Sequence, residues 1–363
     1  MKIVLINSIG KHKWGGGEKW MIMAAKGLMS LGHDVVAIAR KDSLLAQKAH
    51  GENIPVKYIN TNSDFDLYAC FKFCSFFKEF PPDVVIGCQN KDWRVASLAL
   101  KLTGVKAKVY SRQGLQLLKN HWWYKCSVKM LCDGIITNTY TIKKEYEKFL
   151  PVEQNFIKVI FNGVEPVYNG IEGFNYSSFI PGAVKNPLVV LSTGRLAYQK
   201  GFRYLIDAAA MVIKENPHVF FFLAGQGKLE SILRERIEDL GISRNFILLG
   251  FVEDVHSLLK NADIFVLTSL YEGMPNSILE AMVHGLPIVS TRVNGVSELI
   301  EDGVNGYTID SKNIQKIYSA LDHLVNDEQR RAEFGQKARE YVSSEFSVKR
   351  MVRDLDQYLK SDI

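Results

Sequence analysis

The stretch from residue 268 to residue 291, TSLYEGMPNSILEAMVHGLPIVST, places two glutamates, Glu272 and Glu280, eight residues apart. It continues an apolar run, ADIFVLTS, of the kind that forms a buried parallel strand. Pro275 suits the first position of a helix, because its fixed φ and missing N–H cost nothing there, and Gly285 suits the C-terminal cap. The pattern therefore predicts Glu272 on a strand-to-helix loop and Glu280 inside the helix.

The start of this predicted helix is a candidate anion site. First-turn amides have no partner within a helix, and here they belong to Asn276, Ser277 and Ile278. Carboxylates on either side could accept hydrogen bonds from hydroxyl groups. The stretch is suited to a diphosphate between a ribose and a hexose, although an ordinary capped helix with solvated glutamates has the same spacing.

A second stretch, LSTGRLAYQKG at 191–201, places two cations after another predicted strand. Gly194 ends the strand, Arg195 follows it, and Lys200 precedes the next helical pattern. A guanidinium fork and an ammonium point charge can together neutralise a pyrophosphate. The alternative is a pair of ordinary surface cations.

Three glycines, Gly15 to Gly17, stand between the first predicted strand, KIVLINS, and a helical pattern. Such glycines allow the backbone to approach an anion or a sugar closely. The order is not GxGxxG, and the second predicted strand ends in AIARKD without an acid to hold a ribose. These departures disfavour a dinucleotide-dependent dehydrogenase.

The alternation of short apolar runs and helical patterns continues along all 363 residues. It predicts an α/β protein with two doubly wound domains, at 1–165 and 166–345. The turn-rich segment at 165–187 is interpreted as a linker or as a loop-rich entry to the second domain. A final helix at about 346–363 is expected to be able to pack back on the first domain. Ligands of such sheets bind outside the carboxyl ends of the strands, so the loops there are the candidate sites.

The composition excludes several classes of protein. With 45 basic and 39 acidic residues the net charge is +6, and no nucleic-acid-binding motif accompanies it. The first apolar run is too short for a secretory signal, and none is long enough to span a membrane. The five cysteines match no zinc spacing and are expected to be reduced thiols of a cytoplasmic protein.

Seven motifs in order resemble one family over nearly the whole chain. They are GGGE, GLMSLGHDV, FNGVE, STGRLAYQKG, LAGQGKLE, LLGFVEDV and SLYEGMPNSILEAMVHGLPIVST. The sequence is similar to the retaining GT-B glycosyltransferases of family four, the glycosyltransferase group 1 type. The resemblance implies two Rossmann-like domains facing across a cleft, with the acceptor on the N-terminal side and a nucleotide sugar on the C-terminal side.

The resemblance also implies an activity and its partners. A hexose would pass from a UDP- or GDP-linked donor to a glycan or lipid-linked acceptor with retention of configuration, in cell-envelope polysaccharide synthesis. No cofactor, no metal and no nucleic acid are expected. Two rival interpretations are a GT-B sugar-nucleotide epimerase, which needs no acceptor, and an inactive sugar-nucleotide-binding subunit.

Residue roles follow from the matched motifs. Glu280 would hold the ribose hydroxyls and Glu272 those of the transferred sugar, while Arg195 and Lys200 neutralise the diphosphate; these last three form the expected catalytic set. The implied donor-binding set is Gly15, Gly16, Asn162, Gly163, Gly194, Phe251, Val252, Gly273, Met274, Pro275, Asn276, Ser277 and Glu280. Within it, Phe251 and Val252 would meet the base through their backbone, Gly15 and Gly16 would approach from the opposite domain, and Asn162 and Gly163 would lie near the hinge.

The sequence departs from the family at one acceptor-side position. After the fourth N-terminal strand the family often carries a His, whereas this chain reads VYSRQGL, with Gln113 beside Arg112. Glutamine cannot shuttle a proton but is expected to donate a hydrogen bond to a sugar hydroxyl. His12 and His121 are the nearest substitutes by loop position, and a surface role is favoured for both.

Two further patterns lie in the N-terminal half. The DFD triplet is a metal-binding pattern of a different glycosyltransferase fold, but here it precedes a helix, which predicts Asp64 as the N-cap and Asp66 as first-turn charge. The segments CFKFCSFFKEF (70–80) and KNHWWYKC (119–126) mix aromatic residues with lysines. They suggest peripheral contact with the inner face of the cell membrane, or, for the first segment, aromatic packing against the sheet.

Overall fold

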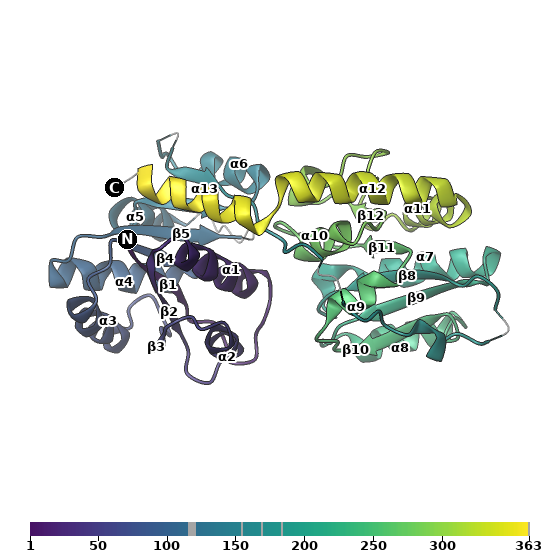
Figure 1. Ribbon diagram of the computed structural model, residues 1–363, viewed down its shortest axis with the longest axis horizontal. Coiled ribbons are helices and arrows are strands. Elements are labelled where there is room, and N and C mark those ends of the chain that lie inside the picture. The colour runs from purple at the N-terminus through teal and green to yellow at the C-terminus, as the bar shows by residue number, and fades with distance from the viewer. Residues whose placement is uncertain (115–120, 154, 168–169, 183, 362–363) are drawn as a thin grey trace. The chain divides into compact units, whose positions relative to one another are not determined.

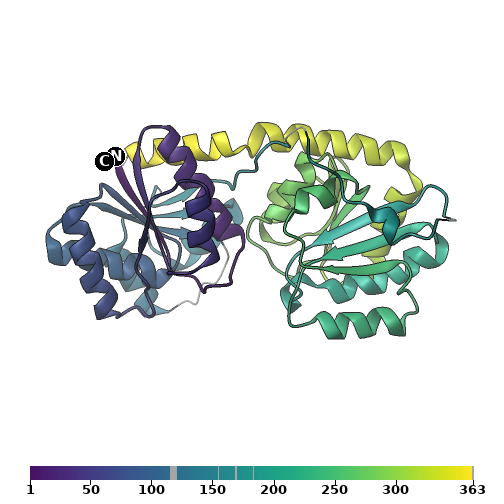
Figure 2. The ribbon, with the colours of Figure 1, turned by 60° about the horizontal axis from the view of Figure 1, so that its bottom comes forward.

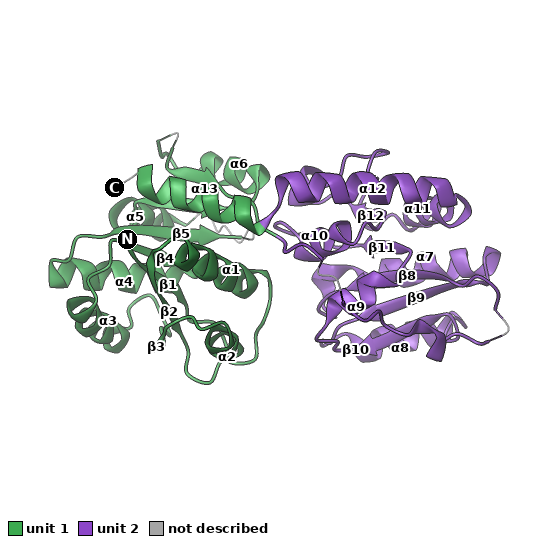
Figure 3. Cartoon of the chain, in the orientation of Figure 1, with its two compact units in different colours: residues 1–163, 348–363 green, residues 164–347 purple. Residues whose placement is uncertain are grey.

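The computed structural model describes residues 1–363 except 115–120, 154, 168–169, 183 and 362–363. The chain forms two compact units, coloured separately in Figure 3. Unit 1 contains residues 1–163 and 348–363, and unit 2 contains residues 164–347. The C-terminal helix therefore belongs to the same unit as the N-terminal strand.

Unit 1 is built on a seven-stranded sheet in the order β3-β2-β1-β4-β5-β6-β7. Every neighbouring pair is parallel, and in the middle of the sheet Ile3 lies between Val35 and Val84. The strands are β1 (Lys2–Asn7), β2 (Asp34–Ala39), β3 (Val56–Tyr58), β4 (Val84–Gly87), β5 (Lys108–Gln113), β6 (Gly134–Thr137) and β7 (Ile157–Val159).

Helices cover both faces of this sheet (Figures 1 and 2). Because successive side chains of a strand point to opposite faces, Ile3 and Leu5 pack with α1, α2 and α13, whereas Val4 and Ile6 pack with α3 to α6. The helices are α1 (Gly16–Ser30), α2 (Leu44–Gly51), α3 (Leu67–Glu79), α4 (Asn90–Thr103), α5 (Trp122–Leu131), α6 (Tyr140–Phe149) and α13 (Val348–Ser361).

Unit 2 repeats the plan with a six-stranded parallel sheet in the order β10-β9-β8-β11-β12-β13. The strands are β8 (Leu188–Thr193), β9 (Val219–Ala224), β10 (Phe246–Gly250), β11 (Ile264–Leu267), β12 (Ile288–Thr291) and β13 (Gly306–Ile309). The helices are α7 (Phe202–Glu215), α8 (Glu230–Asp239), α9 (Val255–Lys260), α10 (Asn276–Val283), α11 (Ile314–Asn326) and α12 (Glu328–Glu345). The buried face of the amphipathic helix α7 packs with Val190, Phe221 and Val266 of three adjacent strands.

The turn-rich segment at 165–187 contributes to the core of unit 2. Tyr176 is buried, its ring lies 4.5 Å from that of Phe222, and its hydroxyl donates to the carbonyl of Leu258 at 2.9 Å. The segment therefore covers part of the sheet that the helices leave open.

Two local predictions were wrong. Asp66, not Asp64, is the N-cap of α3, and its carboxylate accepts a hydrogen bond from the Ala69 amide that lowers the pKa of Asp66. Asp64 instead pairs with Arg94 at 2.7 Å. Both aspartates satisfy the capping pattern, so the sequence could not show which would be used. The sequence pattern at 296–301 also predicts an α-helix, whereas the structure has a 3₁₀ turn at Asn294–Glu298.

The five cysteines are free thiols, of which Cys70 and Cys132 are buried and Cys126 is exposed. Within the described ranges, we find no helix with the length and apolar character needed to cross a membrane.

Close packing of α1 on α13 yields a stability prediction. A Cβ atom on Gly27 would lie 2.2 Å from Cγ2 of Val352, although alanine is otherwise the better helix former. We expect Gly27→Ala to destabilise unit 1 by about 1–3 kcal/mol through overpacking. In urea unfolding, Val352→Ala alone should lower the free energy of unfolding. In the Gly27→Ala background the same substitution should change it little. Additive effects of the two substitutions would contradict this contact.

Candidate functional site

Each sheet has one point where the strand order reverses, between β1 and β4 in unit 1 and between β8 and β11 in unit 2. Ligands of open α/β sheets bind outside the carboxyl ends of the strands at such points. The predicted site residues lie on the loops at these two carboxyl edges, and each edge forms a polar network within its own unit.

In unit 2 the loop after β8 carries Gly194, Arg195 and Lys200. Gly194 has φ +153°, a conformation that side chains rarely adopt, and its amide donates to the Ala224 carbonyl at 2.9 Å. Arg195 is exposed and, among the residues that the structure describes, makes no ion pair or hydrogen bond through its side chain. Arg195 is thus a free cation at the carboxyl end of a central strand.

Lys200 and Glu272 form an ion pair across the two loops. Lys200 Nζ lies 2.6 Å from Glu272 Oε1, and the two side chains are only 16% and 9% exposed. Ser269 Oγ donates to the same oxygen at 2.7 Å. Over the described chain no hydrogen bond reaches Oε2, which is therefore the oxygen that Glu272 can offer to a ligand hydroxyl.

The two loops are also joined through their backbones. Thr268 Oγ1 donates to the carbonyls of Lys200 and Gly201, and the Leu270 amide donates to the Gln199 carbonyl at 2.7 Å. Gly201 has φ +61°, and a Cβ atom there would lie 2.2 Å from the Thr268 carbonyl oxygen. Glycine at 201 lets the loops approach closely enough for the ion pair.

The loop after β9 supports the same edge, which the sequence analysis did not recognise. Leu196 donates its amide to the Gln226 carbonyl at 2.9 Å. A Cβ atom on Gly225 or Gly227 would lie 1.9 Å from Gly194 O or 2.2 Å from Leu196 O, respectively. The LAGQGKLE motif contains two glycines separated by a single residue, which indicates a loop whose backbone is closely approached. The motif alone does not show that the Arg195 loop is what approaches it.

The N-terminus of α10 differs from the prediction in two details. Pro275 is the N-cap, with φ −76° and ψ 108°, so the helix begins one residue later, at Asn276. The Ile278 amide donates to the Pro275 carbonyl at 3.1 Å and is therefore not an open donor. Ser277 keeps an amide without a partner in the described chain, and its buried hydroxyl has none either.

The other predicted donor residues of unit 2 surround this helix start. Gly273 and Met274 are buried in the loop, and Glu280 is 8% exposed, one turn into α10. Gly285, with φ +75°, ends the helix as predicted. At the other side of the sheet, Phe251 follows β10 with its ring 67% exposed, and Val252 is half-buried.

In unit 1 the carboxyl edge holds a chain of buried amides and one carboxylate. Asn7 Nδ2 donates to Glu18 Oε1 at 2.9 Å, and Gln89 Nε2 donates to Asn7 Oδ1 at 3.2 Å. Glu18 belongs to the first turn of α1 and is 5% exposed. These links hold the glycine loop, with Gly15 as N-cap and Gly16 opening the helix, against the switch point.

Arg112 lies at the same edge, 7% exposed. Its Nη2 donates to Asn162 Oδ1 at 3.0 Å, and its guanidinium carbon lies 4.6 Å from the centroid of the Trp20 ring. Burial lowers the pKa of Arg112, and the charge of Glu18 opposes this shift. A guanidinium remains protonated in proteins, so Arg112 is a buried positive charge. Next to Asn162, Gly163 approaches α13, where its amide donates to Met351 Sδ at 3.2 Å.

Gln113 offers a different group from the one expected. Its Nε2 donates both to Asn90 Oδ1 at 2.9 Å and to Ser111 Oγ at 2.7 Å. Both amide hydrogens are thus engaged, and the carbonyl oxygen is left to accept a hydrogen bond from a ligand. His12 and His121 are exposed, and His121 caps α5 through Nδ1, so both have the surface positions that were favoured for them.

Buried polar atoms without partners lie on the neighbouring strand. Two of these atoms are Asn138 Oδ1 and Thr137 Oγ1, at the carboxyl end of β6. Neither atom has a hydrogen-bond partner among the described residues, and Asn138 and Thr137 are only 3% and 1% exposed. Buried polar groups are normally satisfied, so such atoms indicate a place for a ligand or water. Amide side chains therefore end β1 and β5 and follow β4, β6 and β7, an arrangement suited to the hydroxyl groups of a sugar.

Asp92 fixes the loop that follows β1. It is fully buried in α4 and accepts hydrogen bonds from the amide of Ser8, at 3.1 Å, and from the Ser8 hydroxyl. Burial raises the pKa of Asp92 to about 6, against the lowering effect of the bonds from Ser8.

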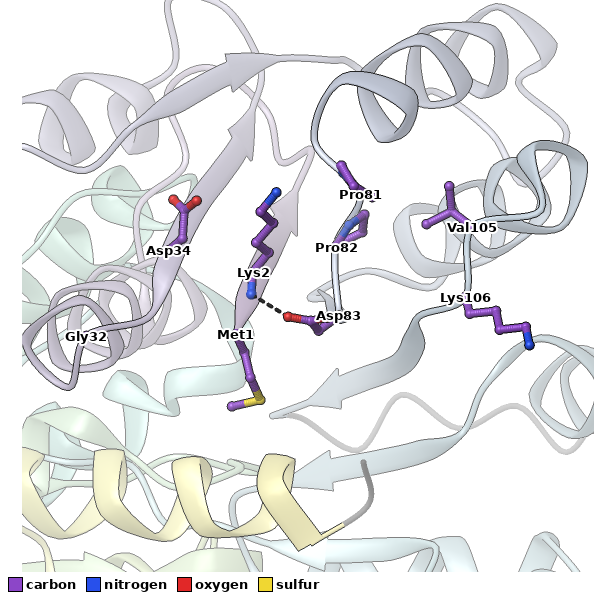
Figure 4. A pocket seen from close by; sticks show the side chains of 9 residues that line it. All are labelled: Met1, Lys2, Gly32, Asp34, Pro81, Pro82, Asp83, Val105 and Lys106. Atoms are coloured by element: carbon purple, nitrogen blue, oxygen red, sulfur yellow. Dashed lines mark hydrogen bonds between the residues drawn. The ribbon is translucent and has the colours of Figure 1, made fainter.

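A hollow of about 570 Å³ in unit 1 lies elsewhere (Figure 4). It is lined by residues at the amino ends of the strands, among them Lys2, Asp34 and Asp83, and the Lys2 amide donates to Asp83 at 2.7 Å. Because ligands of these sheets bind at the carboxyl ends, we assign no donor or acceptor role to this hollow.

Comparison with known proteins identifies the family. Residues 175–341 match the family described as "Glycosyl transferases group 1", and residues 14–168 match "Glycosyltransferase Family 4". The fold matches Anabaena HepE in complex with UDP and glucose, with a TM-score of 0.85 at 23% identity over 99% of this chain and 100% of that one. The chain belongs to the group 1, family 4 glycosyltransferases and has their GT-B fold, as predicted.

Two relatives are named for sugar transfer to a diphosphoundecaprenol-linked sugar and to poly(ribitol-phosphate). The chain is 28% identical to the Escherichia coli UDP-Gal:alpha-D-GlcNAc-diphosphoundecaprenol alpha-1,3-galactosyltransferase over 76% of this chain and 74% of that protein. It is 33% identical to the Staphylococcus aureus poly(ribitol-phosphate) alpha-N-acetylglucosaminyltransferase, over 48% of this chain and 37% of that protein. The protein is therefore a glycosyltransferase.

The pKa of Asp92 predicts a pH dependence. Since its folded value, about 6, lies above the usual 3.8, Asp92 contributes stability that is present below that usual value and lost as the pH rises through 6. The difference corresponds to about 3 kcal/mol. Urea unfolding of wild type and Asp92→Asn should show the wild-type advantage shrinking by up to this amount between about pH 4 and pH 7. A pH-independent difference would contradict a buried, titrating Asp92.

The Lys200–Glu272 pair predicts strong coupling between two substitutions. Lys200→Met leaves a buried carboxylate without its cation, which we expect to cost about 3 kcal/mol of unfolding free energy. Adding Glu272→Gln removes the stranded charge and should recover at least about 1 kcal/mol. Denaturant unfolding of both single variants and the double variant measures the coupling, and strictly additive losses would show that the pair does not act as a unit.

Proposed function

We propose that this glycosyltransferase moves a hexosyl group from a UDP- or GDP-linked sugar to a glycan or lipid-linked acceptor, with retention of configuration and without a metal. The acceptor belongs to cell-envelope polysaccharide synthesis, at the inner face of the cell membrane. The named activities of the two relatives support an envelope acceptor, and the complex of HepE with UDP and glucose supports a nucleotide-sugar donor.

The observation that carries the donor assignment is the edge of unit 2. A free arginine, the start of a helix with an unpartnered Ser277, and a carboxylate held by Lys200 and Ser269 lie on two hydrogen-bonded loops. A diphosphate would be stabilised by Arg195 and by the amide and hydroxyl of Ser277. Glu272 Oε2 would accept a hydrogen bond from the hexose, and Glu280 from the ribose.

The ion pair separates the roles of the two cations. Because Lys200 is neutralised by Glu272 at 2.6 Å, its main effect is to hold that carboxylate in position. Arg195 has no such partner in the described chain, so its charge acts on the ligand. As the glycosidic bond breaks, negative charge grows on the leaving phosphate oxygen, and a preorganised cation there lowers the barrier.

Retention is proposed from the family resemblance. In the mechanism that the resemblance implies, the leaving diphosphate takes the proton of the acceptor hydroxyl on the same face of the sugar from which it departs. The protein then needs no base. Gln113 supports this scheme, because it stands where relatives often carry a His and cannot accept a proton at neutral pH. Arg195 and the start of α10 supply a positive field at the diphosphate, which is the basis for proposing independence from metal.

The unit 1 edge is proposed as the acceptor side. Its amides and the Gln113 carbonyl oxygen can hydrogen-bond sugar hydroxyls, and the buried charge of Arg112 is suited to an anionic group such as an acceptor phosphate. Gly15 and Gly16 are proposed instead to offer their backbone to the donor, as the family resemblance implies.

The proposal is tested in two stages. Thermal shift against a panel of UDP- and GDP-sugars identifies the donor, since a ligand at a hundred times its Kd stabilises by about 2.7 kcal/mol. Turnover with acceptor present, an anomeric proton spectrum of the product, and assays with a chelator then test transfer, retention and metal independence. Conversion of the donor to an epimer without acceptor, or binding without turnover over a broad acceptor panel, would overturn the proposed transfer.

Arg195 provides the site prediction. We expect Arg195→Ala to lower kcat by about 10²–10³ with a smaller change in donor Kd, and Arg195→Lys to recover little, since an ammonium lacks the fork. Arg203→Ala, an exposed arginine of α7, is the matched control. Normal turnover of Arg195→Ala at saturating donor would mean that Arg195 only holds the donor.

A further inference from the structure

The outer surface of three helices in unit 1 is apolar where solvent-facing helices are normally polar. The residues concerned belong to α3, α4, α5 and the turn before α3, and each side chain is at least 37% exposed. They are Phe65, Leu67, Tyr68, Phe71, Leu98, Leu102, Trp122 and Met130, which are 8 of the 17 large apolar side chains found exposed in the described chain. We call this surface the α3–α5 face.

The exposed apolar residues of α3 are additional to the apolar residues with which this helix packs against the sheet. Phe73, Phe76 and Phe77 already form the buried side of this helix against the sheet, as the second interpretation of segment 70–80 expected. Phe71, two residues before Phe73, is 73% exposed on the opposite side. A surface helix needs only one apolar side to pack, so the second one indicates a partner outside the unit.

The three helices form one continuous face. Cys74 Sγ donates to the Ala99 carbonyl at 3.7 Å, which joins α3 to α4, and Lys101 Nζ donates to the Met130 carbonyl at 2.8 Å, which joins α4 to α5. The rings of Phe65 and Trp123 lie 5.4 Å apart, before α3 and in α5. In both Figure 1 and Figure 2 the three helices lie together on one side of unit 1.

The charges on this face are positive. Its cations, exposed or half-buried, are Lys72, Lys78, Lys101, Lys125 and Lys129. The three helices carry only two acids: Glu79 pairs with Lys57 at 3.8 Å, and Asp92 is fully buried. The turn before α3 adds Asp64, which pairs with Arg94 at 2.7 Å, and Asp66, whose carboxylate caps α3. Lys72 also lies over the Tyr68 ring, with 4.4 Å from Nζ to the centroid. Apolar rings and cations are thus interleaved.

The whole of unit 1 shares this sign. It contains 28 lysines and arginines against 16 aspartates and glutamates, a net charge of +12, whereas unit 2 has 17 against 23, a net charge of −6. A hollow of about 630 Å³ at the end of the face has an excess of positive charge. It is lined by four lysines, Lys101, Lys106, Lys108 and Lys129, and by two aspartates, Asp83 and Asp133, the second of which lies 3.9 Å from Lys108. An anionic group is therefore attracted to unit 1 and to this face in particular.

We propose that the α3–α5 face docks on an anionic lipid bilayer, with its exposed rings and aliphatic side chains in the headgroup region and its lysines against lipid phosphates. Interfacial binding of this kind combines buried apolar area with attraction to anionic lipid. A soluble polyanion would satisfy the lysines but not the apolar side chains. A second copy docking by the same face would oppose lysines to lysines, because a two-fold interface pairs a patch with itself.

Docking of this face has a consequence for the acceptor, which rests on the proposed function. The helices α3 and α5 begin at the carboxyl edge of the sheet, so Phe65, Tyr68 and Trp122 lie at the edge that carries Gln113 and the buried amides. A bilayer under the face would bring a lipid-linked acceptor to that edge.

Vesicle co-sedimentation of the full chain tests the docking. Wild type is expected to sediment with vesicles of phosphatidylcholine and phosphatidylglycerol, weakly with phosphatidylcholine alone, and less in high salt. Phe71→Ser with Leu102→Ser should lower the partition coefficient at least about tenfold. Lys72→Gln with Lys129→Gln should lower it about fivefold per lysine on anionic vesicles only.

Matched controls lie on other surfaces. Leu31→Ser in unit 1 and Lys337→Gln in unit 2 remove an exposed apolar side chain and an exposed lysine elsewhere, and both should bind as wild type does. Circular dichroism confirms folding of each variant. The proposal is overturned if wild type stays in the supernatant with anionic vesicles, if controls and face variants lose binding equally, or if light scattering shows a dimer that Phe71→Ser disrupts.

Activity separates this inference from the proposed function. With a water-soluble acceptor analogue, the face variants should turn over the donor as wild type does, and only transfer to a lipid-linked acceptor in vesicles should fall. Vesicle binding without any transfer by wild type would count against the proposed function and leave the docking intact. Full transfer from vesicles by the double serine variant would overturn the docking.

Discussion

The contact between Lys200 and Glu272 is the constraint on which the unit 2 site depends. A carboxylate that is only 9% exposed must be compensated, and a lysine 72 residues earlier in the chain provides the charge at 2.6 Å. The lysine can reach it only because Gly201 lets two loops touch and Thr268 caps the carbonyls where they meet. The pair therefore places a fixed acceptor oxygen, Arg195 and the start of α10 on one connected support.

The carboxyl edge of the sheet in unit 1 is held together by different interactions. Its edge relies on two amides in series, Gln89 and Asn7, which end on the carboxylate of Glu18, and on a guanidinium held by Asn162 and the Trp20 ring. Charge is concentrated in unit 2's ion pair, whereas unit 1 offers mainly hydrogen-bonding groups around one buried cation. The difference matches what each side is proposed to bind, a diphosphate on one and sugar hydroxyls on the other.

Local signals predicted the fold well, because strands and helices of a parallel sheet leave a period and a boundary residue in the sequence. Glu272 on the loop and the glycine that ends α10 followed from that reasoning. Pairings between distant segments left no such signal: nothing near Lys200 shows that its partner is Glu272, or that Gln89 meets Asn7. Where two residues could serve equally, as with Asp64 and Asp66, only the packed structure decides which one caps the helix.

The return of the last helix to unit 1 has a consequence for synthesis of the chain. Helix α13 covers one face of the first sheet through Val352 against Gly27 and through Asp356, which bonds His33 at 2.7 Å. Residues 164–347 are synthesised before α13, so unit 2 is made while the sheet face that α1 and α2 share with α13 still lacks its third helix. The N-terminal unit, although made first, completes the packing of this face only after residues 348–361 have been synthesised.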